Sequence, residues 1–342
     1  MSYITISKKK FYLNLEIISK MANGLENVAL VLKDNAYGHG LRIIAKLASE
    51  YGIRHAVVRT FYEATEIETL FESVLVLSDI QKVKCNNSIH FTINSLEDID
   101  KVYKGASVEL KVDTGMNRNG ITQSELGEAL EKINLNSLLL KGLFTHHSSA
   151  DLDDEKFNFQ NDKFVAIKEK VLSFAKQNNW SRPRVHSSNS AALFRKGIDG
   201  EDIARVGIAA YGCLQMPEKL THEHLKLKPI LSLYSHKIST RTLKGGGCVG
   251  YNEAYTANCD EVVSTYDIGY ADGFSRLQDN INYITPNGYR LLGRVSMDSI
   301  SLSSEDDEVL LFDDAREYSK VCNTISYEVL VRLSANISRK VE

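Results

Sequence analysis

The sequence predicts an α/β protein with a (β/α)8, TIM-like barrel followed by a mostly antiparallel β domain. Over roughly the first two-thirds of the chain, short β-rich runs alternate with helical patterns, which is typical of a parallel sheet. After about residue 225, β-like runs follow one another with few helical segments between them. We therefore expect a barrel domain at 1–225 and a β domain at 226–342, with the short segment 1–10 packing against the second.

Eight strands are expected in the first domain, because eight apolar, β-branched runs lie between helical patterns. Their ranges are Val28–Lys33, His55–Val58, Ser73–Ser78, Ile89–Ile93, Val108–Asp113, Leu138–His146, Arg184–Ser188 and Ala204–Ile208. Apolar residues at helical spacing predict helices at Leu41–Ala48, Glu63–Phe71, Leu96–Tyr103, Ser124–Ile133 and Lys163–Gln177. Eight such repeats favour a closed barrel over an open sheet.

The second domain is expected to contain four long strands, at Ile230–Ile238, Glu261–Ile268, Tyr289–Val295 and Glu308–Phe312. The dipeptide Asn287-Gly288 is a typical hairpin turn, and it precedes the third of these runs. Near the end of the chain, Thr324 is expected to cap a helix over Tyr327–Leu333.

Composition and charge exclude several classes of function. A net charge of −3 without a basic stripe argues against nucleic-acid binding. No apolar run approaches the length of a membrane-spanning helix, so no membrane partner is expected. The five cysteines are scattered, without the paired spacing of a metal site, and are typical of reduced thiols in a cytoplasmic protein.

Polar motifs gather where the predicted barrel strands end, which is the catalytic face of this architecture. Lys33 ends the first strand, and a lysine there can form a Schiff base with a carbonyl compound. The loops after strands seven and eight often bind phosphate, and Ser190 and the Gly207–Ile208 amides lie there. A lysine opposite a phosphate cradle is what pyridoxal 5'-phosphate (PLP) requires.

These motifs resemble those of the bacterial, PLP-dependent alanine racemase family over almost the whole chain. The matching pieces are Lys33–Gly40, Lys111–Arg118, Thr145–His146 with Ala150-Asp151, His186–Ser190, Arg205–Gly212, Val249–Tyr251, Ile268–Gly273, Gly293-Arg294, Met297-Asp298 and Tyr327-Glu328. The resemblance implies an isomerase that interconverts L- and D-alanine and supplies D-alanine for peptidoglycan. Asp34 and Val206 depart from the usual pattern of the family, where a small residue and a proline are common.

The resemblance also implies residue roles. Lys33 would carry PLP and act as one catalytic base, and Arg205 would lie against the pyridine nitrogen. A guanidinium only donates hydrogen bonds, so that nitrogen would stay unprotonated. Arg118 would donate to the phenolic oxygen of PLP and help to bind substrate. The remaining cofactor-binding residues would be Tyr37, Ser190, Gly207, Ile208 and Tyr327 for the phosphate, and His146 in a hydrogen-bonded chain between Arg205 and the catalytic tyrosine.

Lys111 has two open interpretations. In many relatives this position carries a carbamate that orients the arginine at position 118. An unmodified lysine within a buried strand needs a partner instead, and Asp113 or Glu109 could supply it by an ion pair.

Tyr251 would be the second catalytic base, and in the family this tyrosine comes from the partner subunit. Racemisation benefits from one acid–base group on each face of the reacting carbon, and Lys33 with Tyr251 fits that need. A homodimer with shared active sites is therefore expected. Met297, by its backbone amide near the substrate carboxylate, and Asp298 would also come from the partner, while Tyr270, Tyr327 and Asp298 would narrow the entrance.

The sequence leaves two other functions open. One is an amino-acid racemase of broader specificity, which accepts serine or longer substrates. The other is a non-catalytic PLP-binding barrel protein, against which Tyr251 and the added β domain argue, since cofactor binding alone needs neither.

Overall fold

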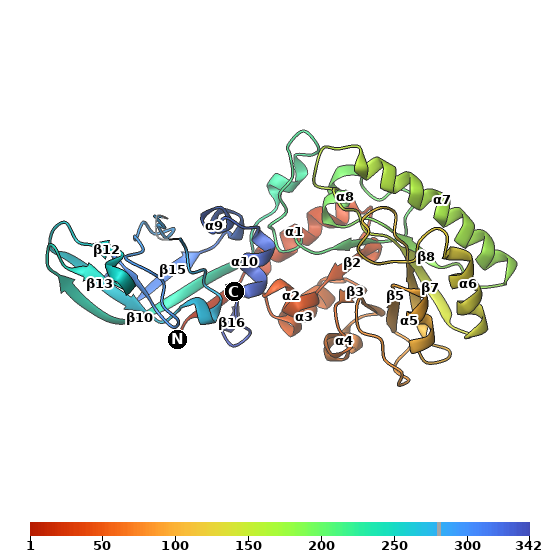
Figure 1. Ribbon diagram of the computed structural model, residues 1–342, viewed down its shortest axis with the longest axis horizontal. Helices are drawn as coiled ribbons and strands as arrows, with labels where there is room; N and C mark the ends of the chain where they lie inside the picture. The colour runs from red at the N-terminus through yellow and green to blue at the C-terminus, as the bar shows by residue number, and fades with distance from the viewer. Residues whose placement is uncertain (279–281) are drawn as a thin grey trace.

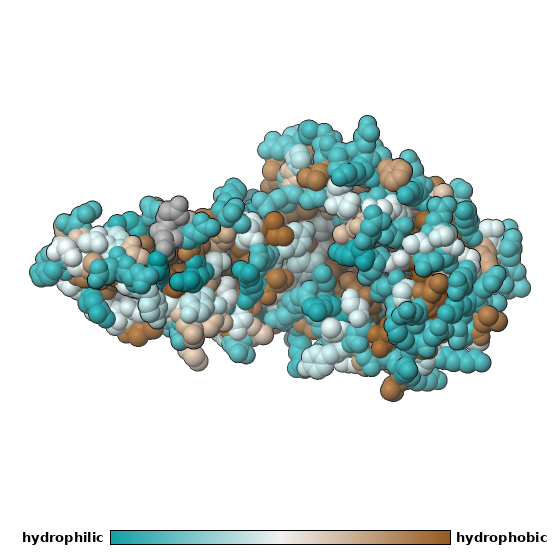
Figure 2. Space-filling model, in the orientation of Figure 1, coloured by the Kyte–Doolittle hydropathy of each residue, from teal (hydrophilic) through white to brown (hydrophobic). Residues whose placement is uncertain are grey.

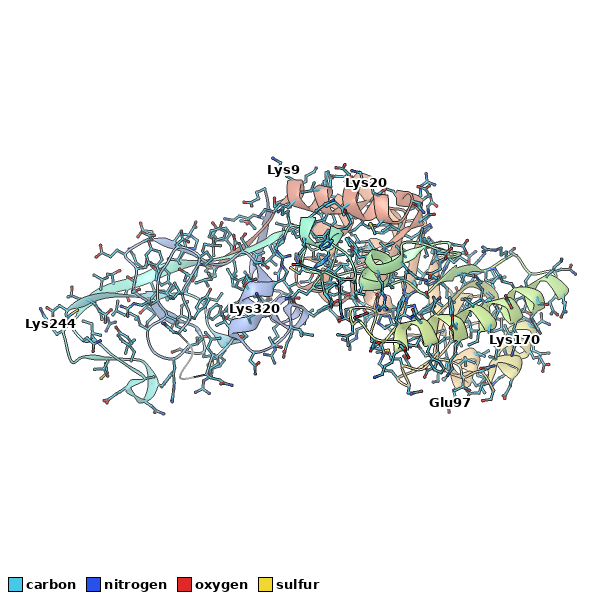
Figure 3. The ribbon with its side chains drawn as sticks, turned by 90° about the horizontal axis from the view of Figure 1, so that it is seen from above. Lys9, Lys20, Glu97, Lys170, Lys244 and Lys320 are labelled. Carbon is cyan, nitrogen blue, oxygen red and sulfur yellow. The ribbon has the colours of Figure 1, made fainter. Side chains whose placement is uncertain are left out.

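The protein is described by a computed structural model that covers residues 1–278 and 282–342. Figure 1 shows an elongated molecule with the barrel at one end and the β domain at the other. In the same view, Figure 2 shows that most of this face is hydrophilic and that the molecule is wider at the barrel end. Seen from above, Lys244 lies at the tip of the β domain and Lys170 lies on the helix at the opposite end (Figure 3).

The barrel consists of eight parallel strands in the order β8-β7-β6-β5-β4-β3-β2-β9. Hydrogen bonds of 2.8 Å from Asp202 N to Val185 O and from Arg205 N to Ser188 O join the two ends of this sheet. The strands are β2 (Val28–Val31), β3 (His55–Val58), β4 (Ser73–Val76), β5 (Ile89–Ile93), β6 (Ser107–Lys111), β7 (Leu139–Phe144), β8 (Arg184–His186) and β9 (Ala204–Val206). The predicted barrel is therefore confirmed.

Helices surround the barrel strands, as Figure 1 shows. Their bounds are α1 (Lys8–Met21), α2 (Lys33–Tyr37), α3 (Leu41–Tyr51), α4 (Phe61–Ile67), α5 (Leu96–Lys101), α6 (Leu126–Leu135), α7 (Lys156–Gln177) and α8 (Ser190–Lys196). Helix α1 begins at its N-cap Ser7 and buries Phe11, Leu15 and Ile18. These three residues recur at helical spacing, although polar residues between them hide the pattern in the sequence.

The β domain is built on the long strand β10 (Leu231–Leu243), which pairs with β1 (Tyr3–Ile6), β13 (Glu261–Tyr266) and β15 (Glu308–Phe312). The other strands are β11 (Cys248–Val249), β12 (Tyr255–Thr256), β14 (Ile300–Leu302) and β16 (Ser338–Val341). Strand β1 also pairs with β16 in parallel, whereas the other pairs of this domain are antiparallel. The N-terminus thus ties the β domain to α1 and the barrel.

The β domain differs from expectation in three details. The run Tyr289–Val295 forms isolated bridges at Arg290 and Leu291 instead of a strand. The structure also contains a helix that was not expected, α9 (Ala315–Val321), and Asp314 caps it by accepting a hydrogen bond from Arg316 N. The last helix is α10 (Ser326–Arg332), with Ile325 at the N-cap position, so Thr324 is not its cap.

Along the chain that the structure describes, no helix combines the length and the apolar character that crossing a membrane requires.

Candidate active site

Lys33 lies two residues after the end of β2, at the start of a left-handed turn. The next four residues, Asp34 to Tyr37, have φ angles between +52° and +57°. Such a run of non-glycine residues is costly, at about 1–2 kcal/mol per residue. Surrounding contacts hold the turn in place: Asn35 Oδ1 accepts from Leu41 N at 2.8 Å, and Arg339 Nε donates to Gly38 O at 2.9 Å. The turn brings the Asp34 carboxylate to 3.7 Å from Lys33 Nζ.

Tyr37, at the end of this turn, reaches the loop after β9. A Cβ at Gly207 would lie 2.5 Å from the Tyr37 hydroxyl, so glycine leaves the space that the tyrosine fills. Ser190 Oγ accepts hydrogen bonds from Gly207 N at 3.0 Å and Ala209 N at 3.4 Å. The Tyr37 ring also lies 6.0 Å from the Tyr327 ring of α10. The structure therefore brings these four predicted residues together.

This cluster contains hydrogen-bond donors that have no acceptor in the described residues and could bind a phosphate. The Tyr37 and Tyr327 hydroxyls and the Ile208 amide have no hydrogen-bond partner in the described residues, and the Ser190 hydroxyl proton has no acceptor there. The Gly207 amide donates to Ser190 Oγ, and the absence of a side chain at Gly207 leaves the space that the Tyr37 hydroxyl fills. Several free N–H and O–H donors around one point suit a multiply charged oxyanion.

Arg205 is buried on β9 and is held by four of its five N–H bonds. Nη1 donates to His186 Nδ1 at 2.6 Å and to His186 O at 3.1 Å. Nη2 donates to Thr145 O at 2.6 Å and to Ser187 O at 3.2 Å. The fifth donor, Nε–H, has no acceptor in the part of the chain that the structure describes. Burial lowers the pKa of Arg205 to about 10, so the group stays charged at neutral pH.

Lys111 and Arg118 lie on β6 and the loop after it. Asp113 Oδ1 shapes this loop by accepting from Gly115 N, Met116 N and Asn117 N at 2.8–3.2 Å. Lys111 Nζ donates to Asn119 Oδ1 and forms no ion pair within the described residues. Burial, reinforced by the Arg118 and Arg205 charges, lowers the pKa of Lys111 to about 8. Neither Asp113 nor Glu109 pairs with the Lys111 ammonium. The ion pair, one of the two interpretations of Lys111, is therefore not formed within the described residues.

His146 follows β7 and faces the same cationic groups. Burial, together with the charges of Arg205, Arg118 and Lys111, holds the pKa of His146 well below its usual range. Its imidazole has no hydrogen-bond partner in the described residues, so the expected link to Arg205 is not formed within one chain. His146 is thus a neutral base among cations.

Tyr251, Tyr270, Met297 and Asp298 lie on the β domain. Tyr251 opens the short turn η4 (Tyr251–Glu253), and its side chain is 63% exposed. Tyr270 N donates to Ser296 O at 3.1 Å, which sets Tyr270 beside Met297. Figure 1 places β12, next to this turn, far from β2 and from α2, which begins at Lys33. One chain therefore does not bring Tyr251 to Lys33.

Glu109 and His186 support Arg205 from below, and the sequence did not predict this role for either residue. Glu109 Oε2 accepts from His186 Nε2 at 2.7 Å, so it contacts the residue that holds Arg205. A signal exists in the sequence: Glu109 and Lys111 are two apart on one strand and so face the same side.

Family models match nearly the whole chain. "Alanine racemase, N-terminal domain" matches residues 6–215, and "Alanine racemase, C-terminal domain" matches residues 230–341. The chain is 43% identical over 339 residues to the alanine racemase of a Nitratiruptor species and 40% identical over 340 residues to that of Campylobacter curvus, with 99% of both chains covered in each case.

Solved structures agree with these matches. The alanine racemase from Bacillus anthracis with bound L-Ala-P is 27% identical, with a TM-score of 0.85 over 100% of this chain and 95% of that chain. The alanine racemase from E. faecalis is 28% identical, with a TM-score of 0.82 over 100% of this chain and 98% of that chain.

Proposed function

The chain belongs to the alanine racemase family and racemises alanine, and from this premise we propose that it does so with PLP on Lys33 and with Tyr251 of a second subunit. The premise also makes the protein an isomerase. D-Alanine for peptidoglycan would be its product.

The donor set around Gly207 supports PLP as the cofactor. Tyr37, Ser190, Tyr327 and the Ile208 amide would bind its phosphate, and Lys33 Nζ would bind its aldehyde carbon covalently. Arg205 Nε–H would donate to the ring nitrogen, and Arg118 to the phenolic oxygen. When bound, PLP supplies an electron-accepting ring that makes the α-hydrogen of the amino acid easier to remove.

Lys33 Nζ and Tyr251 Oη would hold and move the α-proton on opposite faces of the substrate. By resemblance to the family, Lys33 would serve D-alanine and Tyr251 would serve L-alanine. A tyrosine has an ordinary pKa of about 10 and needs a neighbour that accepts its proton. His146 is suited to this, because burial and nearby cations keep its imidazole neutral.

A homodimer would complete the site. Tyr251 and Met297 are 63% and 54% exposed, and Tyr270 and Tyr327 are also exposed. Exposed tyrosine and methionine side chains are enriched at protein–protein interfaces. With the partner in place, Met297 would bind the substrate carboxylate together with Arg118, while Tyr270, Asp298 and Tyr327 would narrow the entrance.

Lys111 would carry a carbamate. Carbamylation needs a neutral amine, and a pKa near 8 leaves a substantial neutral fraction at pH 7–8. The product is a carboxylate, which would attract Arg118 and replace one of two repelling cations. Nuclear magnetic resonance (NMR) with ¹³C-bicarbonate should show a carbamate signal that is absent in Lys111→Gln and that grows from pH 7 to 9. A spectrum without this signal would leave Lys111 as a free amine.

The single observation that carries the proposal is the left-handed turn, since it joins Lys33 to Tyr37 and so to the donors near Gly207. Borohydride treatment of the PLP-loaded protein should fix the cofactor irreversibly, and peptide mapping should find it on Lys33. The matched control is Lys33→Ala, which should retain little cofactor after reduction. An adduct on Lys111 or another lysine would overturn the assignment.

A further inference from the structure

A buried polar network lies beneath the cofactor-binding residues in the barrel interior, with Glu109 at its centre. Glu109 Oε1 accepts from His90 Nδ1 at 2.7 Å and from Arg184 Nη2 at 2.5 Å. Glu109 Oε2 accepts from His186 Nε2 at 2.7 Å. The Glu109 side chain is fully buried, and Gly142 on the neighbouring strand leaves the space that the carboxylate occupies.

The charges in this network are balanced so that Glu109 stays ionised. Burial alone would raise the pKa of Glu109, but the Arg184 charge and the hydrogen bonds from His186 and His90 outweigh burial and hold this pKa well below its usual range. Burial lowers the pKa of His186 to about 4, so the imidazole is neutral at pH 7. A neutral imidazole carries one proton, and the network decides which nitrogen has it.

The Arg205 contact decides the tautomer. A guanidinium can only donate, and its Nη1 lies 2.6 Å from His186 Nδ1, so Nδ1 must be the acceptor. The proton of His186 is then on Nε2, where the Glu109 carboxylate accepts it. The His186 ring is also fixed by stacking on Phe144, with centroids 4.9 Å apart and planes 8° apart.

We propose that Glu109 is a positioning residue: its carboxylate holds His186 as the Nε2–H tautomer, and His186 in turn fixes the Arg205 guanidinium with Nε–H directed to the cofactor ring. Glu109 acts through two residues and touches neither cofactor nor substrate. The proposal rests on the proposed function, because the contact of Arg205 with the ring belongs to it.

An amide at position 109 would disturb this arrangement in a defined way. With its oxygen on Arg184 and His90, a glutamine would turn its NH2 group toward His186 Nε2. The His186 proton would then move to Nδ1. There, two N–H donors would face each other, that of His186 Nδ1 and that of Arg205 Nη1. The reverse orientation would point the NH2 group at Arg184, which also only donates.

The first test uses the cofactor-free wild-type protein labelled with ¹⁵N-histidine. Long-range ¹H–¹⁵N spectra should show His186 protonated on Nε2 and unprotonated on Nδ1 throughout pH 6–8, with the signals assigned by their loss in His186→Gln. An imidazolium or an Nδ1–H tautomer in the wild type would overturn the proposal without any variant at position 109.

The second test compares Glu109→Gln with the control His90→Gln. The nearest analogy is a carboxylate that orients a metal-bound histidine, whose loss typically costs about 10–100-fold in activity. We expect a loss of that order in kcat for Glu109→Gln. The same variant should show the Nδ1–H signal of His186. His90→Gln keeps a donor for Glu109 Oε1, so its His186 tautomer should be that of the wild type and its kcat should change little.

The outcomes separate the two proposals. Wild-type kcat and an unchanged tautomer in Glu109→Gln would overturn the positioning role, as would equal losses in both variants. Failure of the proposed function would appear instead in the borohydride mapping at Lys33, because the tautomer measurement contains no cofactor.

Discussion

The Tyr37 hydroxyl lies 2.5 Å from the point where a Cβ at position 207 would stand. This relationship links the left-handed turn after β2 to the loop after β9, which are 170 positions apart in the chain. The two segments meet only because β2 and β9 are neighbours in the barrel. A tyrosine hydroxyl at this point has no internal acceptor in the described residues, which suits it to an external anion.

Gly207→Ala should therefore weaken PLP binding. The new methyl group would displace the Tyr37 hydroxyl, and a hydrogen bond to a charged group contributes about 1.5–3 kcal/mol, which corresponds to roughly tenfold or more in Kd. Fluorescence titration of the cofactor-free protein with PLP would measure this change. The control is Gly127→Ala on α6, where an added Cβ meets nothing within 4 Å. Equal affinity in both variants would contradict the role given to Tyr37.

His39 should make stability depend on pH. This residue is fully buried, its Nδ1 lies 3.0 Å from Ala36 O and 2.9 Å from Tyr37 O, and burial lowers its pKa to about 4. Because the folded pKa is below the unfolded value of about 6.5, the unfolded chain binds the proton more readily between these values. The stability that neutral His39 provides is present above pH 6.5 and is lost as the pH falls toward 4.

His39→Asn keeps a donor for the two carbonyl oxygens of the turn but does not titrate. The unfolding temperature of this variant should fall less steeply between pH 6.5 and 4 than that of the wild type. His222→Asn, at an exposed position, should retain the wild-type slope. A slope unchanged in His39→Asn would mean that His39 does not contribute to the pH dependence.

The barrel strands could be predicted because each is a short apolar run between helical patterns, as in β2 and β3. The run Tyr289–Val295 also contains a tyrosine, two leucines and a valine, but Gly293 adopts a φ of +72° and the segment forms isolated bridges only. Helix α9 is seven residues long, which is too short for helical periodicity to be distinct.

The motif around Lys33 could be recognised, but its left-handed conformation could not be predicted. Asp34, Asn35, Ala36 and Tyr37 include residues that rarely adopt positive φ, and distant contacts such as that of Arg339 with Gly38 hold them there. The role of Glu109 was hidden for a similar reason. Its partners His90 and His186 come from other strands, and only the barrel brings them together.

Mixing two inactive variants should restore activity if Lys33 and Tyr251 come from different chains. In a heterodimer of Lys33→Ala and Tyr251→Phe, one of the two sites contains both native residues, so random mixing should give about a quarter of wild-type activity. If each chain supplied both residues to its own site, every site in the mixture would lack one of them. Assays after unfolding and refolding the mixture together, compared with each variant refolded alone, would distinguish these cases.

Tyr251→Phe should separate the two directions of proton transfer. A general acid or base contributes on the order of 10²–10⁴ in rate, so net racemisation should fall by at least that much while PLP binding is retained. The overall equilibrium constant between enantiomers is one, so asymmetry must appear in exchange with solvent and not in the equilibrium. In heavy water, the variant should still incorporate deuterium into D-alanine through Lys33 but exchange L-alanine far more slowly.

Tyr270→Phe provides the comparison for this asymmetry. Tyr270 is an exposed tyrosine of the same domain, proposed to line the entrance, and loss of its hydroxyl would change access for both enantiomers alike. Unequal exchange in Tyr251→Phe but equal exchange in Tyr270→Phe would therefore identify Tyr251 as the group that moves the proton on one face. Equal losses of exchange in Tyr251→Phe would instead make Tyr251 a residue that positions the substrate, and the second base would have to be sought elsewhere.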